Sequence, residues 1–137
     1  MDFTEAQTAL VKAIVGSAAI GAWERLVANV EILEHEGDYQ LDYVCLAVVR
    51  GDGTLSTEQF DLSDEAREAA AALYRQRKEE AGETIGGFEA TVDSTGAYRI
   101  AIDHDAPKRI NGVWDEEREG RLDHYLDHYK AELAGSR

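Results

Sequence analysis

The sequence predicts an α+β fold, with a mainly antiparallel sheet of about five strands and three helices in the order α-β-β-β-α-β-β-α. Apolar residues recur at helical spacing in some segments and alternate at strand spacing in others. Glycine-containing turns join neighbouring strands, as in hairpins. The 137 residues correspond to one domain, residues 1–137, and we find no internal repeat.

The first half of the chain predicts one helix and three strands. Apolar residues at helical spacing place the helix over residues 3–18. Alternation predicts a strand over 22–33, and a segment rich in β-branched and aromatic residues predicts a central strand over 39–50. Gly51-Asp52-Gly53 is a hairpin turn, and the more polar segment 54–60 after it is expected at an edge of the sheet.

A second helix is expected over residues 63–81, capped by Ser63 and ended by Gly82. Two strands follow, over 88–92 and 98–102, joined by a tight turn. The apolar face of the helix consists of small residues that allow close approach to a sheet: Ala66, Ala69, Ala70 and Leu73.

The last part of the chain predicts a loop over 105–112 and one long helix over 115–134. The helix carries an apolar stripe that we expect to face the core, formed by Leu122, Tyr125, Leu126, Tyr129 and Leu133.

The charge is far from balanced. Asp and Glu number 28 and Lys and Arg number 14, for a formal net charge of -14. Such a field repels nucleic acid and anionic membranes and attracts basic partners. The sequence has neither a signal-peptide pattern nor a long apolar span, so we expect a cytoplasmic protein that binds no nucleic acid and no membrane.

The usual catalytic patterns do not occur in the sequence. Cys45 is the only cysteine and lies in the most apolar segment, where a thiol is expected to be buried and inert. Gly86-Gly87 is not followed by the Lys-Ser/Thr pair of a phosphate loop. We therefore predict no catalytic residue, no metal and no cofactor.

The histidines offer the main alternative to a binding protein. His124 and His128 have the i, i+4 spacing of two metal ligands on one helix, but they lie opposite its apolar stripe and are expected to face solvent. Asp103 and His104 supply further ligand types where a strand ends. A metal-dependent enzyme using these four residues thus remains an alternative.

Acidic residues crowd the last third of the chain. Such a run either compensates a helix dipole and aids solubility, or it forms a face that binds a basic partner. In the second interpretation Trp114 is an aromatic anchor among carboxylates. The predicted partner-binding residues are Asp103, Asp105, Trp114, Asp115, Glu116 and Glu119.

Four consecutive segments form a pattern known from one protein family. An N-terminal amphipathic helix leads through a glycine-containing link into Ala22–Glu31, which is similar to the Trp-Glu opening of the family's first strand. The Tyr39–Tyr43 strand, an acidic-headed middle helix and the hairpin Phe88–Ile100 follow. Over about residues 5–105 the chain resembles the YezG-like immunity (antitoxin) proteins of bacterial polymorphic toxin systems.

The resemblance implies a protein without catalytic residues that binds and blocks a toxin, typically a nuclease. This agrees with the charge, because the substrate groove of a nuclease is basic and carboxylates can occupy the place of phosphates. The expected partner is therefore a basic protein, with a nuclease toxin as the first choice. The other alternative is a generic acidic interaction or scaffold protein, for which the exposed edge strand 54–60 offers a route to a homodimer.

Overall fold

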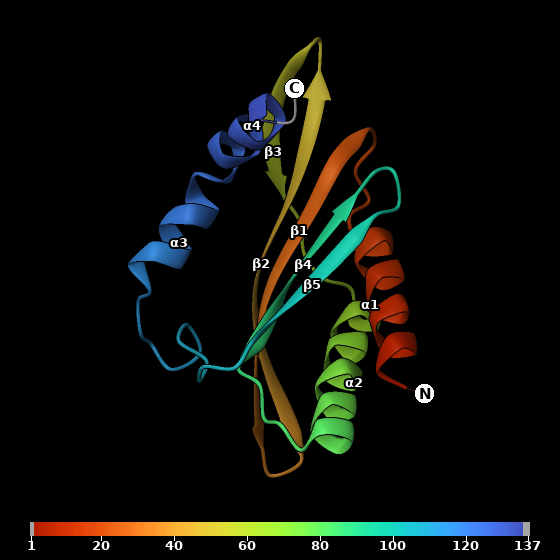
Figure 1. The fold of residues 1–137 in the computed structure, drawn as a ribbon, viewed down its shortest axis with the longest axis vertical. Coiled ribbons are helices and arrows are strands. Elements are labelled where there is room, and N and C mark those ends of the chain that lie inside the picture. The colour runs from red at the N-terminus through yellow and green to blue at the C-terminus, as the bar shows by residue number, and fades with distance from the viewer. Residues whose placement is uncertain (1, 136–137) are drawn as a thin grey trace.

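The computed structural model describes residues 2–135, and in this part of the chain it has four helices and one antiparallel sheet of five strands (Figure 1). Positions 1, 136 and 137 of the predicted domain lie outside the described residues. The α+β prediction and the element order up to β5 are confirmed. The elements are α1 (Phe3–Ser17), β1 (Trp23–His35), β2 (Asp38–Gly51), β3 (Thr54–Gln59), α2 (Asp64–Ala81), β4 (Gly87–Asp93), β5 (Tyr98–Asp103), α3 (Glu116–Asp123) and α4 (Tyr125–Gly135).

The strands lie in the order β3-β2-β1-β4-β5, so β1 is central and β3 and β5 are the edges. Hairpins connect β1 to β2, β2 to β3 and β4 to β5, whereas α2 carries the chain from one edge of the sheet to the other side of β1. None of the helices formed by residues 2–135 is both long and apolar enough to cross a membrane.

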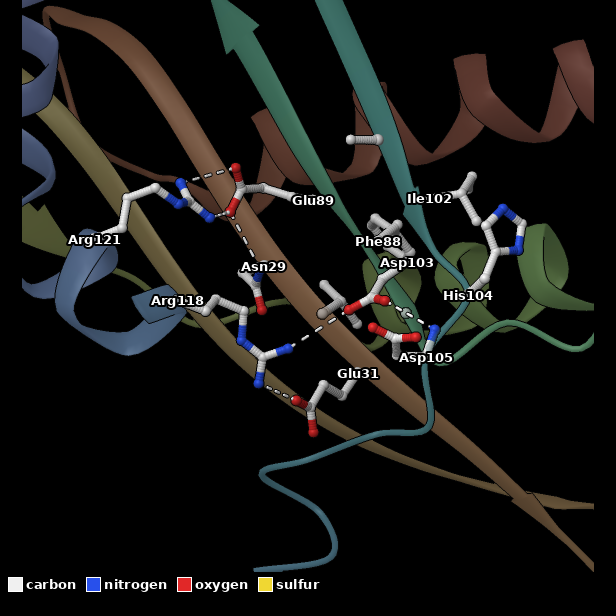
Figure 2. Close-up of a pocket in the computed structure, with 13 residues that line it drawn as sticks. Asn29, Glu31, Phe88, Glu89, Ile102, Asp103, His104, Asp105, Arg118 and Arg121 are labelled. Carbon is white, nitrogen blue, oxygen red and sulfur yellow. Dashed lines mark hydrogen bonds and ion pairs between the residues drawn. The ribbon is translucent and has the colours of Figure 1, made fainter. Parts of the chain in front are cut away.

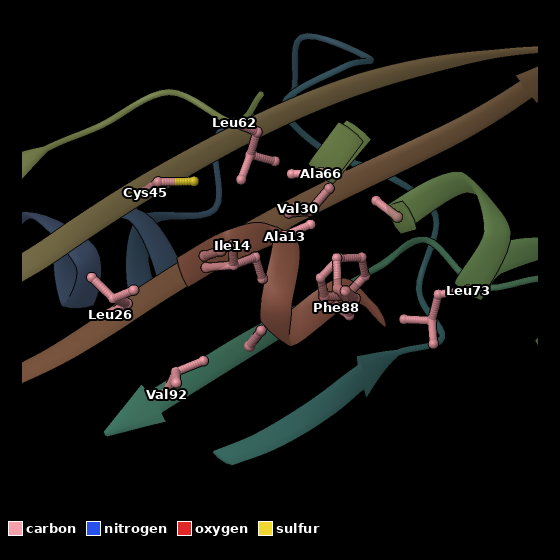
Figure 3. Close-up of a cluster of buried hydrophobic side chains, with 14 of the residues drawn as sticks. Ala13, Ile14, Leu26, Val30, Cys45, Leu62, Ala66, Leu73, Phe88 and Val92 are labelled. Carbon is pink, nitrogen blue, oxygen red and sulfur yellow. The ribbon is translucent and has the colours of Figure 1, made fainter. Parts of the chain in front are cut away.

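Helices α1 and α2 cover one face of the sheet and enclose the main core (Figure 3). Every second residue of β1 points into this core, including Leu26, Val30 and Ile32, each exposed by at most 1%. The small face predicted for α2 packs here, with Ala66, Ala70 and Leu73 buried and Ala69 partly buried. Alanines on this face bring the helix close to the strands, and the long side chains of β1 and β4 fill the space between the layers.

Helices α3 and α4 lie along the opposite face of the sheet (Figure 1). The predicted stripe makes the contact: Leu122, Tyr125 and Tyr129 are buried against Val27, Leu46 and Val48, and Leu126 and Leu133 pack partly against this second, smaller cluster. This face therefore has a core of its own over β1 and β2.

The prediction of one helix over 115–134 is wrong, because the chain breaks at His124. His124 has φ −110° and ψ 26°, outside the helical region, and α4 starts anew at Tyr125. The break lets α3 lie over the polar part of β1 while α4 places Tyr125 and Tyr129 on the apolar part. Residue 124 is neither glycine nor proline, so the sequence pattern continues through the break without a signal.

The start of β4 approaches neighbouring backbone closely. A Cβ on Gly87 would lie 2.1 Å from the carbonyl oxygen of Val30, and one on Gly86 would lie 1.6 Å from that of Asp105. The Gly86 amide donates to the Asp103 carbonyl, and the Ile32 amide donates to the Gly86 carbonyl. Only glycine leaves room for this junction, which fixes the loop after β5 against the sheet.

Candidate partner-binding surface

The acidic residues after position 102 divide into an interior group and an exposed group. The structure places the Asp103 side chain, the Glu119 side chain and Asp115 beside basic residues. It leaves Asp105, Trp114 and Glu116 exposed. The six predicted partner-binding residues thus do not form one uniform patch, and the two groups have different chemistry.

The interior group belongs to an ion-pair network between the sheet and α3. Glu31, on β1, is only 2% exposed, and its carboxylate accepts hydrogen bonds from the Arg118 guanidinium and, at 3.0 Å, from the Ile110 amide. Glu119 is 6% exposed and binds Arg118 at 2.9 Å and Arg109 at 3.2 Å. Each buried carboxylate therefore has a cationic partner, as burial of charge requires.

Arg109 joins this network to the loop and to β2. Its guanidinium binds the Asp42 carboxylate at 2.5 Å and donates to the Asn29 carbonyl at 3.1 Å. The loop between β5 and α3 is thereby held across β1 and β2. The loop carries Trp114, so the network fixes the base of the exposed segment.

Hydrogen bonding controls the protonation of Glu31. Burial by itself raises the pKa of this carboxyl, but hydrogen bonds from the backbone amides of Ile110 and Arg109 and from Arg118 outweigh it. The pKa of Glu31 consequently lies below the ordinary value of 4.5, and the group is ionised at neutral pH. Glu31 is a structural anion rather than a proton donor.

A cavity of about 450 Å³ lies between α3 and the β4–β5 hairpin (Figure 2). Arg121 of α3 binds the Glu89 carboxylate of β4 at 2.6 Å, and Arg118 lies between Glu31 and Asp103. The Asn29 amide also donates to Glu89, at 3.1 Å. Both arginines are engaged by carboxylates, so on the α3 side the cavity wall consists of ion pairs, while His104 and Asp105 line it at the end of β5.

The exposed group surrounds the start of α3. Trp114 is 68% exposed and Val113 is 53% exposed, although side chains of this size are usually covered. The carboxylates of Glu116 and Glu117 are exposed and form no ion pair with the residues that the structure describes. An aromatic and an aliphatic side chain thus lie next to two acids without counter-ions.

Asp115 connects the exposed group to the fold. Its Oδ1 accepts from the Arg118 amide at 3.1 Å and caps α3, while its Oδ2 binds Lys108 at 2.8 Å. The hydrogen bond from Lys108, together with that from the Arg118 amide, lowers the pKa of Asp115. Asp115 therefore sets the direction in which Trp114 and Glu116 leave the loop.

The histidines do not assemble with the acids. His124 and His128 are exposed, as predicted from the stripe, and His124 Nδ1 is 4.0 Å from Asp127. His104 lies away from the two cavity arginines and is 3.8 Å from Glu83 (Figure 2). Within residues 2–135, no three His, Cys, Asp or Glu side chains are placed to hold a metal ion.

The thiol of Cys45 is buried in the main core, as predicted. Burial raises its pKa to about 12, with the negative charge of Asp61 adding to the effect. A thiol in this state forms almost no thiolate at neutral pH and does not act as a nucleophile.

Glu31, Arg109, Arg118 and Arg121 were not among the predicted site residues, although they hold the surface in place. The sequence contains one signal for them. Asn29 and Glu31 interrupt the apolar residues of the most buried strand, and a polar residue there calls for a partner. No protein-family model matches the chain, and no curated protein matches its sequence.

Proposed function

We propose that this protein is a non-enzymatic immunity protein that binds and blocks a basic protein partner, with a nuclease toxin as the first choice. The observation that carries the proposal is the exposed Val113–Trp114 pair next to the unpaired carboxylates of Glu116 and Glu117. Exposed tryptophans in such positions are frequent centres of protein interfaces.

The two kinds of exposed residue have different tasks in this proposal. Trp114 supplies apolar area that a pocket on the partner desolvates, and it determines how slowly the complex dissociates. Glu116, Glu117 and Asp105 attract cations and determine how fast the complex forms. The net charge of -14 extends this attraction over the whole molecule.

The interior group serves the surface indirectly. Glu119 is buried and already bound to two arginines, so it offers no carboxylate to a partner. The Asp103 and Asp115 carboxylates are bound to Arg118 and Lys108. We therefore assign Asp103, Asp115 and Glu119 to positioning, and Asp105, Trp114, Glu116 and Glu117 to contact with the partner.

The first experiment tests protection. The protein is co-expressed with a basic nuclease toxin, should a neighbouring gene encode one, and cell survival and the Kd of the complex are measured for the wild type and for Trp114→Ala. We expect the wild type to protect and Trp114→Ala to bind at least about 30-fold more weakly, which corresponds to a strong hot-spot residue. Absence of protection by the wild type contradicts the proposal.

The second experiment separates local contact from overall charge. Glu116→Lys/Glu117→Lys and the control Glu58→Lys/Glu79→Lys change the net charge equally, and all four carboxylates are exposed. At low salt we expect the first variant to associate with the toxin about tenfold more slowly than the control. Equal association rates would place the contact surface elsewhere.

A further inference from the structure

Strand β5 is an open edge of the sheet, because it is last in the strand order and, among residues 2–135, pairs only with β4 (Figure 1). Tyr98, Arg99 and Ala101 are exposed along it. Among the described residues Arg99 has no ion-pair partner. Asp103 lies four residues after Arg99 on the same face of β5, and its side chain is 42% exposed. A free sheet edge of this kind is a template for another strand.

Antiparallel geometry limits how β5 could pair with a second β5. Directly opposite residues form either a hydrogen-bonded pair or a non-hydrogen-bonded pair, and the two kinds of pair alternate along the strands. In a symmetric dimer of two β5 strands, the two-fold axis must therefore pass between two copies of the same residue, which face each other. The centre on Ala101 sets Arg99 opposite Asp103 twice and Ile100 opposite Ile102 twice.

The neighbouring registers lack this complementarity. A centre on Ile100 sets Arg99 opposite Ala101, and a centre on Ile102 sets Asp103 opposite Ala101. The central pair in the preferred register is Ala101 with Ala101, whose small side chains allow close approach. In that register both charges of each strand meet the opposite charge, and both isoleucines meet an isoleucine next to the core.

We propose that two copies of this chain associate through their β5 strands, in antiparallel register about Ala101, to form one continuous sheet. The charge on the paired segments sums to zero, because each strand brings one arginine and one aspartate. Repulsion between two acidic molecules is screened beyond about 8 Å at physiological salt. The toxin contacts Trp114 and Glu116 lie outside the paired strands. Asp103 binds Arg118 at 3.7 Å, but its side chain is 42% exposed and can also face Arg99 of the other copy.

The other edge, where the sequence suggested a dimer, fits less well. The only charged residue of β3 is Glu58, so no register of two β3 strands forms an ion pair, and one register opposes two glutamates. Leu55 of β3 also packs in the second cluster on the α4 side. The structure therefore favours β5 over β3 as the dimer edge.

Cross-linking through a single cysteine tests the register. In the proposed dimer the Cα atoms of two Ala101 residues lie about 4.5–5.5 Å apart, within the range of a disulfide. We expect Ala101→Cys to form a covalent dimer under mild oxidation faster than the control Ser56→Cys on β3, which is also exposed. The native Cys45 is buried and does not interfere. Equal or slower cross-linking of Ala101→Cys overturns the proposal.

Charge reversal tests the ion pairs. Arg99→Asp places an acid opposite Asp103 of the other copy at both ends of the paired segment. Sedimentation over micromolar to millimolar concentrations should therefore show dimerisation weakened by about tenfold or more. Arg99→Asp/Asp103→Arg restores opposite charges and should recover the wild-type dimer. Lys12→Asp, at an exposed site on α1, is the control and should leave dimerisation unchanged.

Thermal unfolding of the swapped variant confirms that it is folded, since Asp103 also binds Arg118. Failure of a folded swap to recover the dimer, or a wild type that stays monomeric at millimolar concentration, overturns the proposal. Loss of the dimer in Arg99→Asp with unchanged toxin protection separates this inference from the proposed immunity function.

Discussion

Buried charge is the unusual feature of this protein at the scale of single residues. Glu31 occupies the most central strand, is almost fully covered, and depends on Arg118 and on two backbone amides for compensation. A buried pair of this type adds little net stability compared with apolar residues, but removal of Glu31 takes one carboxylate away from Arg118, which then depends on Glu119 and Asp103. The role of Glu31 is therefore to hold α3 and the loop before it in one position.

Glu31→Gln should lower the free energy of unfolding by about 2 kcal/mol at pH 7, because a buried, charge-assisted hydrogen bond is lost, while Glu119 and Asp103 still compensate the Arg118 guanidinium. The amide oxygen of glutamine can still accept from Ile110, so the loss reports mainly on the ion pair. Urea unfolding measures it. Glu58→Gln, an exposed carboxylate on β3, is the matched control and should change stability by less than about 0.5 kcal/mol.

The same variant gives a pH prediction. The pKa of Glu31 is lower in the folded protein than its ordinary value of 4.5, so its stabilising effect is complete above pH 4.5 and is lost as the pH falls through the folded value. The difference in unfolding free energy between wild type and Glu31→Gln should therefore shrink below pH 4.5. A difference that stays constant from pH 7 to pH 3 would contradict the assigned ionisation.

At the scale of elements, the parts with strong local patterns were predicted correctly. Alternating apolar residues located β1, β4 and β5, and the alanine face located α2. The ion-pair network could not be predicted in the same way, because Glu31 and Arg118 are 87 residues apart and only the fold brings them together. The polar residues Asn29 and Glu31 of β1 indicate that a partner is needed, but they do not indicate that α3 supplies it with arginines.

The α3–α4 layer should be the least stable part of the fold. Its buried contact with the sheet is one small cluster, and ion pairs supply much of the rest, while α1 and α2 enclose the large core. Amides of α3 and α4 should exchange hydrogen faster than those of β1. Leu122→Ala should raise exchange in residues 116–135 selectively, whereas Leu73→Ala in the main core should raise it throughout. A uniform effect of Leu122→Ala would show that the layers unfold together.

At the scale of the whole molecule, the covered cations and the exposed acids lie in different places. The cations that are nearly covered, Arg25, Arg109 and Arg118, are engaged by carboxylates between the sheet and the second helical layer. The acids that have no partner in the described part of the chain lie on the outside, for example Glu58, Glu79, Glu116 and Glu117. The negative surface is thus left for long-range attraction of a partner, and it opposes compactness through self-repulsion.

This separation predicts how salt acts on stability. Raising NaCl from 0.01 M to 0.15 M shortens the screening length from about 30 Å to about 8 Å, which weakens repulsion among the exposed acids. The buried ion pairs are screened much less, because solvent ions do not reach them. The free energy of unfolding should therefore rise over this range. The variant Glu58→Lys/Glu79→Lys has less repulsion to begin with, so its free energy of unfolding should rise less over the same range of salt. A wild type that loses stability with added salt would show that ion pairs, rather than self-repulsion, dominate the electrostatic free energy of folding.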